Sequence, residues 1–126
     1  MHESVISTYG YVRSHHVGGC TVLAFHGEID IAAALEIQPR LDAATSLPRC
    51  RVVIDLSGVD FLDASGLRLL CRARLRVTEG AGLLVLAAPP PRVVWLLRLT
   101  RLDGCFTVLP TLDEALRRAA GPVTTP

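Results

Sequence analysis

The sequence predicts an α/β fold: one domain built on a mostly parallel or mixed five-stranded sheet with about four helices. Its 126 residues are a typical length for one domain, and half of them are hydrophobic, which is enough for a sizeable core. Short strand-forming segments alternate with longer segments whose apolar residues recur every three or four positions, a pattern typical of βαβ units. We expect the domain to span residues 1–126, with its core in residues 9–120 and a polar tail over residues 121–126.

The first segments predict a β-hairpin followed by a helix. Residues 9–15 and 20–26 are rich in aromatic and β-branched residues, and Val17-Gly18-Gly19 between them is typical of a tight turn. Residues 31–45 carry apolar side chains at helical spacing. Pro39 falls inside that segment, so it should kink the helix or delay its start.

The middle of the chain predicts two buried strands on either side of a helix. Residues 51–56 (RVVIDL) form a short apolar run typical of a buried strand, and Ser57-Gly58 predicts a turn after it. A helix is expected over residues 65–79, because apolar residues recur there at helical spacing and two glycines follow. Residues 83–88 predict the second buried strand.

The last third predicts a helix, a short strand and a final helix. Three consecutive prolines precede residues 93–102, whose apolar spacing indicates a helix. Residues 105–109 predict a strand. The segment Thr111-Leu112-Asp113-Glu114 resembles a capping box that opens the final helix, and Gly121 follows its end.

The composition argues against several function classes. The formal net charge of +1 gives no electrostatic footprint for nucleic acid, and no apolar run is long enough to span a membrane. The N-terminus lacks a basic segment followed by an apolar one, so we expect a cytoplasmic protein. Four widely spaced cysteines form no CxxC pair, and His15, His16 and His26 have no other ligands at useful spacing. We therefore expect neither a metal nor a cofactor.

The segment most informative about function is Asp63-Ala64-Ser65-Gly66, where a helix is expected to begin beyond the carboxyl end of a strand. Sites in open α/β sheets gather at such ends. The Ser65 hydroxyl should then lie beside unpaired backbone N–H groups, and Gly66 should leave the surface uncrowded for a partner. The alternative is that Asp63 or Ser65 merely caps the helix, although Asp63 alone can supply that cap.

Two motifs, about thirty residues apart in the sequence, resemble those of a known family. The segment DLSGVDFLDASGLRLL is similar to the signature of STAS domains in bacterial anti-sigma factor antagonists, and Gly27-Glu28-Ile29-Asp30-Ile31 is similar to their G-E-[IL]-D element. The resemblance runs from residue 9 to residue 120. Ala64 stands where a serine or threonine is common, Ala33 stands where a threonine is frequent, and Pro39 falls later than the usual proline.

The resemblance implies a function without catalysis. Ser65, the serine before the glycine, would accept phosphate, and the partner would be an anti-sigma factor that is also a serine kinase. The unphosphorylated chain would bind this partner and release the sigma factor, phosphorylation would end binding, and a protein phosphatase would reset it. The sequence leaves the oligomeric state open. The implied partner-binding residues are Asp30, Asp63, Ala64, Ser65, Gly66 and Arg68.

Two other function classes stay open. A constitutive STAS scaffold, stressosome-like or transporter-associated, would bind a partner without being modified. An enzyme with Ser65 as nucleophile would need a base such as His26, because no histidine follows it and no G-x-S-x-G elbow is present.

Three further features have two readings each. Arg68, Arg72 and Arg76 recur every four residues and would either meet an acidic partner or form a solvated helix face. Asp30 with Asp63 could imitate a glycosidase carboxylate pair, which we consider a poor fit. Trp95 is expected in the core or at its rim.

Overall fold

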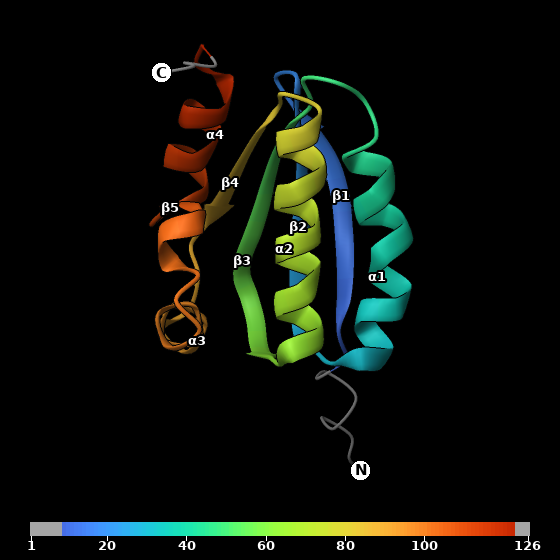
Figure 1. Cartoon of the computed structure of the whole chain (residues 1–126), viewed down its shortest axis with the longest axis vertical. Helices are drawn as coiled ribbons and strands as arrows, with labels where there is room; N and C mark the ends of the chain where they lie inside the picture. Colours follow the sequence, from blue (N-terminus) through green and yellow to red (C-terminus); the bar gives the residue numbers. More distant parts are fainter. Residues whose placement is uncertain (1–8, 123–126) are drawn as a thin grey trace.

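The alternating strands and helices form a five-stranded sheet with helices on both faces (Figure 1). The structure, a computed structural model, describes residues 9–122. The strands are β1 (Tyr11–Val17), β2 (Cys20–Ile29), β3 (Arg51–Leu62), β4 (Leu83–Ala87) and β5 (Thr107–Leu109). The helices are α1 (Ile31–Ala44), α2 (Ala64–Glu79), α3 (Pro91–Leu99) and α4 (Leu112–Ala120), with a 3₁₀ turn η2 at Asp103–Cys105. Strand order is β1-β2-β3-β4-β5, antiparallel only between β1 and β2, which confirms the predicted fold class.

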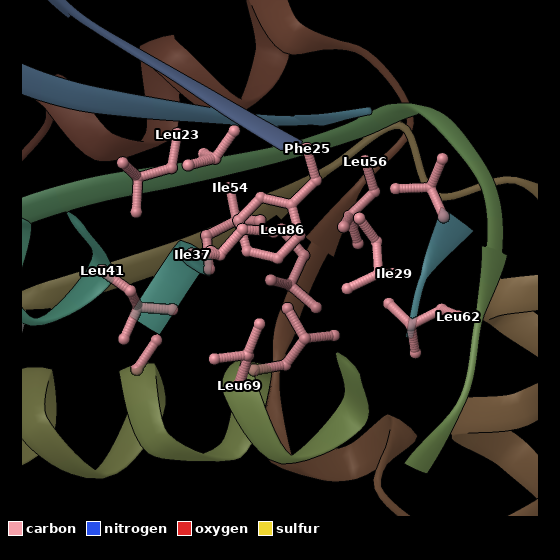
Figure 2. Packing of buried hydrophobic residues seen from close by; sticks show 14 of the residues in the cluster. Leu23, Phe25, Ile29, Ile37, Leu41, Ile54, Leu56, Leu62, Leu69 and Leu86 are labelled. Carbon is pink, nitrogen blue, oxygen red and sulfur yellow. The ribbon is translucent and has the colours of Figure 1, made fainter. Parts of the chain in front are cut away.

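Sequence alternation along the strands decides which helices cover which face. Val52, Ile54 and Leu56 of β3 point into the larger core beneath α1, α2 and α3 (Figure 2). Val53, between them, points to the opposite face and packs with Ala115 of α4. Because side chains alternate across a strand, one apolar run fills both cores.

The predicted hairpin is confirmed, with β1 two residues later in the sequence than predicted and β2 three residues longer. Val17 pairs with Cys20, which leaves Gly18 and Gly19 as the turn, at φ +54° and +83°. Both angles lie in the left-handed region that glycine adopts without steric cost. The turn lies at the top of Figure 1, at the end of the sheet away from the first turns of α1 and α2.

Pro39 does not delay α1, which begins directly after Asp30 and continues through the proline to Ala44. A proline inside a helix leaves the carbonyl four residues earlier without an N–H partner. Here that residue is Leu35, and both Leu35 and Pro39 are exposed, so water can satisfy the carbonyl.

The predicted turn at Ser57-Gly58 is wrong, because β3 continues through it to Leu62. The pairing of β2 with β3 shifts register around these residues, and Asp55 Oδ1 accepts a hydrogen bond from the Ser57 backbone N–H at 3.0 Å. Gly58 packs against His26, whose Nδ1 would lie 2.5 Å from any added Cβ. The glycine therefore serves close strand packing, and the longer strand carries the chain directly to α2.

The last elements occur in the predicted order, and some of their ends differ from the prediction by two or three residues. Pro91 opens α3 at its first helical position, where the missing N–H costs nothing, so α3 begins earlier than predicted. Strand β5 is shorter than predicted because η2 takes up Cys105. The cap predicted at Thr111 is confirmed, since its Oγ1 accepts from the Glu114 backbone N–H at 3.1 Å, and the Glu114 carboxylate accepts from the Thr111 hydroxyl at 3.2 Å. None of the helices within residues 9–122 is both long and apolar enough to cross a membrane.

Candidate functional site

The two motifs meet at one edge of the sheet. Ile29 at the end of β2 pairs with Leu62 at the end of β3, so the residues that follow them, Asp30 and Asp63, come next to each other in the fold. The Asp63 backbone N–H donates to the Ile29 carbonyl at 3.3 Å and ties the two strand ends together. We call this region, the carboxyl ends of β2 and β3 with the first turns of α1 and α2, the acidic edge.

Both aspartates cap the helix that follows them. Asp63 Oδ1 accepts from the backbone N–H groups of Ser65 at 2.8 Å and of Gly66 at 3.2 Å. Asp30 Oδ1 accepts from the Ala33 backbone N–H at 2.9 Å. The expectation that Ser65 lies beside unpaired N–H groups is therefore wrong, because the Asp63 carboxylate already uses two of them. Capping falls to Asp63 alone, which leaves the Ser65 hydroxyl free of that role.

Ser65 is half-buried and lines a groove of about 220 Å³ between α1 and α2. Leu69 lies in the floor, and Ile31 and Leu35, which are 66% and 70% exposed, border it on the α1 side. Arg68 lines it from the second turn of α2. Ala64, the first residue of α2, is exposed. The groove thus combines one hydroxyl with apolar side chains that are costly to leave in water.

Gly66 faces the core rather than the surface, so the expectation that it leaves room for a partner is wrong. It is buried, and a Cβ there would lie 2.7 Å from Leu62 Cγ and 3.0 Å from Ile29 Cγ2. The glycine is needed for α2 to approach β2 and β3 closely. Its contribution to the acidic edge is the position of Ser65, and direct contact with a partner does not fit its burial.

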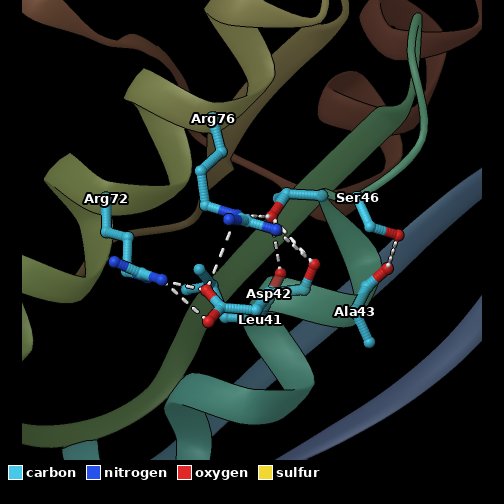
Figure 3. Close-up of polar contacts among 7 residues, drawn as sticks. Leu41, Asp42, Ala43, Ser46, Arg72 and Arg76 are labelled. Atoms are coloured by element: carbon cyan, nitrogen blue, oxygen red, sulfur yellow. Dashed lines mark hydrogen bonds and ion pairs between the residues drawn. The ribbon is translucent and has the colours of Figure 1, made fainter.

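Two of the three arginines along α2 bind α1 instead of solvent or a partner (Figure 3). Arg72 makes a two-pronged pair with Asp42, Nε to Oδ1 at 2.6 Å and Nη2 to Oδ2 at 2.9 Å. Arg76 donates to Thr45 Oγ1 at 2.7 Å and to the Asp42 carbonyl at 2.9 Å. The hydrogen bonds from Arg72 lower the pKa of the Asp42 carboxyl. Within residues 9–122, only Arg68 of the three has no ion-pair partner.

A second hollow adjoins the acidic edge and was missed by the sequence analysis. It measures about 470 Å³ between the end of β3 and α3, with Phe61, Asp63, Arg92 and Trp95 among its lining residues. Trp95 is 63% exposed, so it lies neither in the core nor at its rim as expected. The signal in the sequence was a large aromatic residue at a helix position outside the apolar stripe of Val93 and Leu97.

The structure gives no support to a serine nucleophile or a carboxylate pair. The His26 ring stacks on Tyr11, with centroids 4.9 Å apart, and it does not line the Ser65 groove. Asp30 and Asp63 each use a carboxylate oxygen to accept hydrogen bonds from the backbone N–H groups of a helix N-terminus. Among the described residues, no three histidine, cysteine or acidic side chains come together as metal ligands would.

Known proteins of similar sequence and fold share this architecture. A family model of the STAS domain matches residues 11–115. The anti-sigma-F factor antagonist RsfB of Mycobacterium tuberculosis is 29% identical over 105 residues, which is 82% of this chain and 84% of that protein. An anti-sigma-factor antagonist (STAS) domain protein from Planctomyces limnophilus has a TM-score of 0.81 and 28% identity, covering 88% of this chain and 99% of that one. An anti-sigma factor antagonist from Mycobacterium paratuberculosis has a TM-score of 0.80 and 30% identity, covering 90% and 97%. Since the family model matches most of its length, this chain belongs to the STAS domain family.

Proposed function

We propose that this chain is a cytoplasmic anti-sigma factor antagonist that binds an anti-sigma factor through the acidic edge. The observation that carries the proposal is the pairing of Ile29 with Leu62, which brings Asp30, Asp63 and the Ser65 groove to one surface. Relatives named as antagonists support the class of partner. The exposed Ile31 and Leu35 supply the apolar contact that a protein partner would bury.

We further propose that phosphorylation of Ser65 switches this binding off, with the anti-sigma factor as kinase and a phosphatase reversing the step. A phosphate adds roughly −1.5 to −2 charges at neutral pH. Asp63 already occupies the nearby N–H groups, so the new charge would compete with that carboxylate and add to Asp30. Arg68 lines the same groove and has no ion pair among residues 9–122. A partner packed on Ile31 and Leu35 would then meet a bulky anion.

A second candidate is an antagonist or scaffold that binds without being modified. The observation that favours it is the distribution of exposure: the outermost residue of the first turn, Ala64, has no hydroxyl, while Ser65 is half-buried in the groove. A kinase must reach the acceptor oxygen, so the first proposal requires that the kinase can reach Ser65 within the groove. The two candidates share the binding surface and differ only in the fate of Ser65.

One experiment separates them. The chain is titrated with the purified anti-sigma factors of its host by calorimetry, then incubated with each of them and ATP, and phosphate is located by mass spectrometry. The switch requires binding before ATP, phosphate on Ser65, and no uptake by Ser65→Ala. Ser65→Asp should weaken binding about tenfold or more, while Ser57→Asp, at an exposed serine of β3 outside the groove, should not.

The outcomes are distinct. Binding with no phosphate on Ser65, and equal affinity for Ser65→Asp, would favour the unmodified binder. Failure of every host anti-sigma factor to bind would contradict the antagonist function itself.

A further inference from the structure

A hollow larger than the Ser65 groove lies at the opposite end of the sheet from the acidic edge. It measures about 530 Å³ and lies between the β1–β2 hairpin, the last turn of α1 and the start of β3. In Figure 1 this is the upper end, where the hairpin turn and the connection from α1 to β3 meet. We call it the basic cleft. Its polar lining comes from Ser14, His16, Thr21, Arg40, Arg49 and Arg51.

The charge in the basic cleft is of one sign. Among the described residues, neither an aspartate nor a glutamate lines it. Within residues 9–122, neither Arg40 nor Arg49 forms an ion pair. The acid closest to them along the α1 sequence, Asp42, is bound by arginines of α2. Since the whole chain has a formal charge of only +1, this positive charge is a local feature.

The other side chains of the cleft can also serve an anion. Ser14 and Thr21 each offer a hydroxyl donor, and Thr21 Oγ1 lies 3.3 Å from His16 Nδ1. Arg51 Nη1 donates to the carbonyls of Ala119 and Gly121, and its guanidinium adds positive charge to the cleft. Leu47, which is exposed, lines an apolar side of the cleft.

We propose that the basic cleft binds a small anion that carries phosphate groups. Guanidinium groups match phosphate oxygens in geometry and charge. Two of them line one hollow here and have no carboxylate partner in the part of the chain that the structure describes. The volume lies in the range of small-molecule sites, about 300–1,000 Å³. The apolar side at Leu47 leaves room for an organic group esterified to the phosphate. This site is separate from the acidic edge and does not depend on the proposed function.

The backbone conformation at Arg49 allows the guanidinium to be removed by a substitution that leaves the fold unstrained. Arg49 has φ +58°, in the left-handed region that glycine adopts more readily than arginine. Its backbone N–H donates to the Gly80 carbonyl at 2.7 Å, a bond that glycine keeps. Arg49→Gly therefore removes the guanidinium without straining the fold. Arg101 provides the matched control, since it is exposed, has φ +61°, and lies after α3 outside the cleft.

The experiment is a titration of the full chain with inorganic pyrophosphate at fixed ionic strength, followed by the amide signals in nuclear magnetic resonance. Saturable shifts should be confined to residues 14–21 and 40–51, and signals of residues 60–68 should stay in place. Arg49→Gly should weaken binding about tenfold, and Arg101→Gly less than about twofold. Absence of saturation below about 10 mM, or an equal loss in both variants, would overturn the proposal, because the second result reports net charge alone.

Two more titrations distinguish the source of the phosphate. Tighter binding of ADP than of pyrophosphate, which has the same number of phosphate groups, would indicate a phosphate ester with its organic part against Leu47. Equal or weaker binding of ADP would indicate a free phosphate anion. If adenosine bound as tightly as ADP, the anion proposal would be contradicted.

Discussion

The two ends of the β2–β3 pair use charge in opposite ways. At the acidic edge, Asp30 and Asp63 are bound to the backbone N–H groups of the helices they cap, and Ile31 and Leu35 of α1 are exposed and apolar. At the basic cleft, Arg40 and Arg49 have no carboxylate partner within residues 9–122. The two aspartates at one end are thus already engaged by the backbone, and among the described residues the two arginines at the other end have no counter-charge.

The difference indicates two kinds of recognition. Satisfied caps beside exposed Ile31 and Leu35 suit a protein partner, whose affinity would come from apolar burial. Available guanidinium groups in a hollow suit a small anion, whose affinity would come from charge-assisted hydrogen bonds. The comparison predicts that substitutions at the acidic edge change packing and protein binding. Substitutions at the basic cleft should change anion binding with little effect on stability.

The largest expected effect is the loss of close packing at the acidic edge. Gly66→Ala would place a Cβ 2.7 Å from Leu62 Cγ and 3.0 Å from Ile29 Cγ2, so α2 or the strand ends must shift. Overpacking of this kind costs about 1–3 kcal/mol. Urea unfolding should show a lower midpoint with an unchanged slope. Gly104→Ala is the control, since an added Cβ there meets nothing within 4 Å. Equal stability of the two variants would show that α2 and the strand ends can accommodate the added Cβ, and it would contradict the prediction.

The next effect concerns partner binding rather than folding. Leu35→Ser removes an apolar side chain that borders the Ser65 groove and is 70% exposed. Its free energy of unfolding should change by no more than about 0.5 kcal/mol. Its affinity for the anti-sigma factor, measured by calorimetry, should fall about tenfold to thirtyfold if Leu35 is a central contact.

The matched control is Leu75→Ser on α2, which is also exposed and does not line the groove. An equal loss of affinity in both variants would mean that general surface hydrophobicity, and not the groove, recruits the partner.

A smaller effect separates the two caps of the acidic edge. Asp63 Oδ1 accepts from two backbone N–H groups and Asp30 Oδ1 from one, so Asp63→Ala should cost more than Asp30→Ala. Loss of a cap costs about 1 kcal/mol, within a range of about 0.5–2 kcal/mol. Asparagine at either position should recover most of the stability, because its side-chain oxygen also caps. Thermal unfolding of the four variants measures these differences. A larger loss of stability in Asp30→Ala than in Asp63→Ala would contradict the prediction.

Sequence reasoning predicted the order of elements because apolar periodicity is a local property. The family resemblance grouped Asp30 with Asp63, and the structure brings them together because the parallel strands β2 and β3 end at one edge. Sequence reasoning failed at Ser57-Gly58, where residues typical of a turn instead accompany a register shift that depends on the neighbouring strand. The role of Gly66 was also misjudged, because the side it presents to Ile29 and Leu62 depends on packing.

The arginines of α2 also show that local sequence patterns do not identify partners that are distant in the sequence. Spacing places Arg72 and Arg76 on one face of α2, yet their partner Asp42 lies 30 and 34 residues away in the sequence. The basic cleft draws on the hairpin, the end of α1 and the segment that follows it. A site assembled from such separate segments has no local signature, and only the tertiary structure reveals it.

The smallest expected effect concerns the pair that lies between the two ends. Arg72 hydrogen bonds lower the pKa of Asp42 below its unfolded value of about 3.9, so the pair stabilises the fold fully above that pH. The contribution is lost as the pH falls through the lower folded pKa. Because the side chains of Arg72 and Asp42 are 40% and 28% exposed, solvent screens the pair and we expect its contribution to be small.

The difference in free energy of unfolding between the native chain and Asp42→Asn should therefore be constant near neutral pH and shrink below about pH 4. Arg72→Gln should show the same dependence, and Arg68→Gln, which breaks no ion pair within residues 9–122, should not. Stability curves that stay parallel into acid would assign the effect to packing. In that case packing, and not the charge of Asp42, would join the α2 arginines to α1.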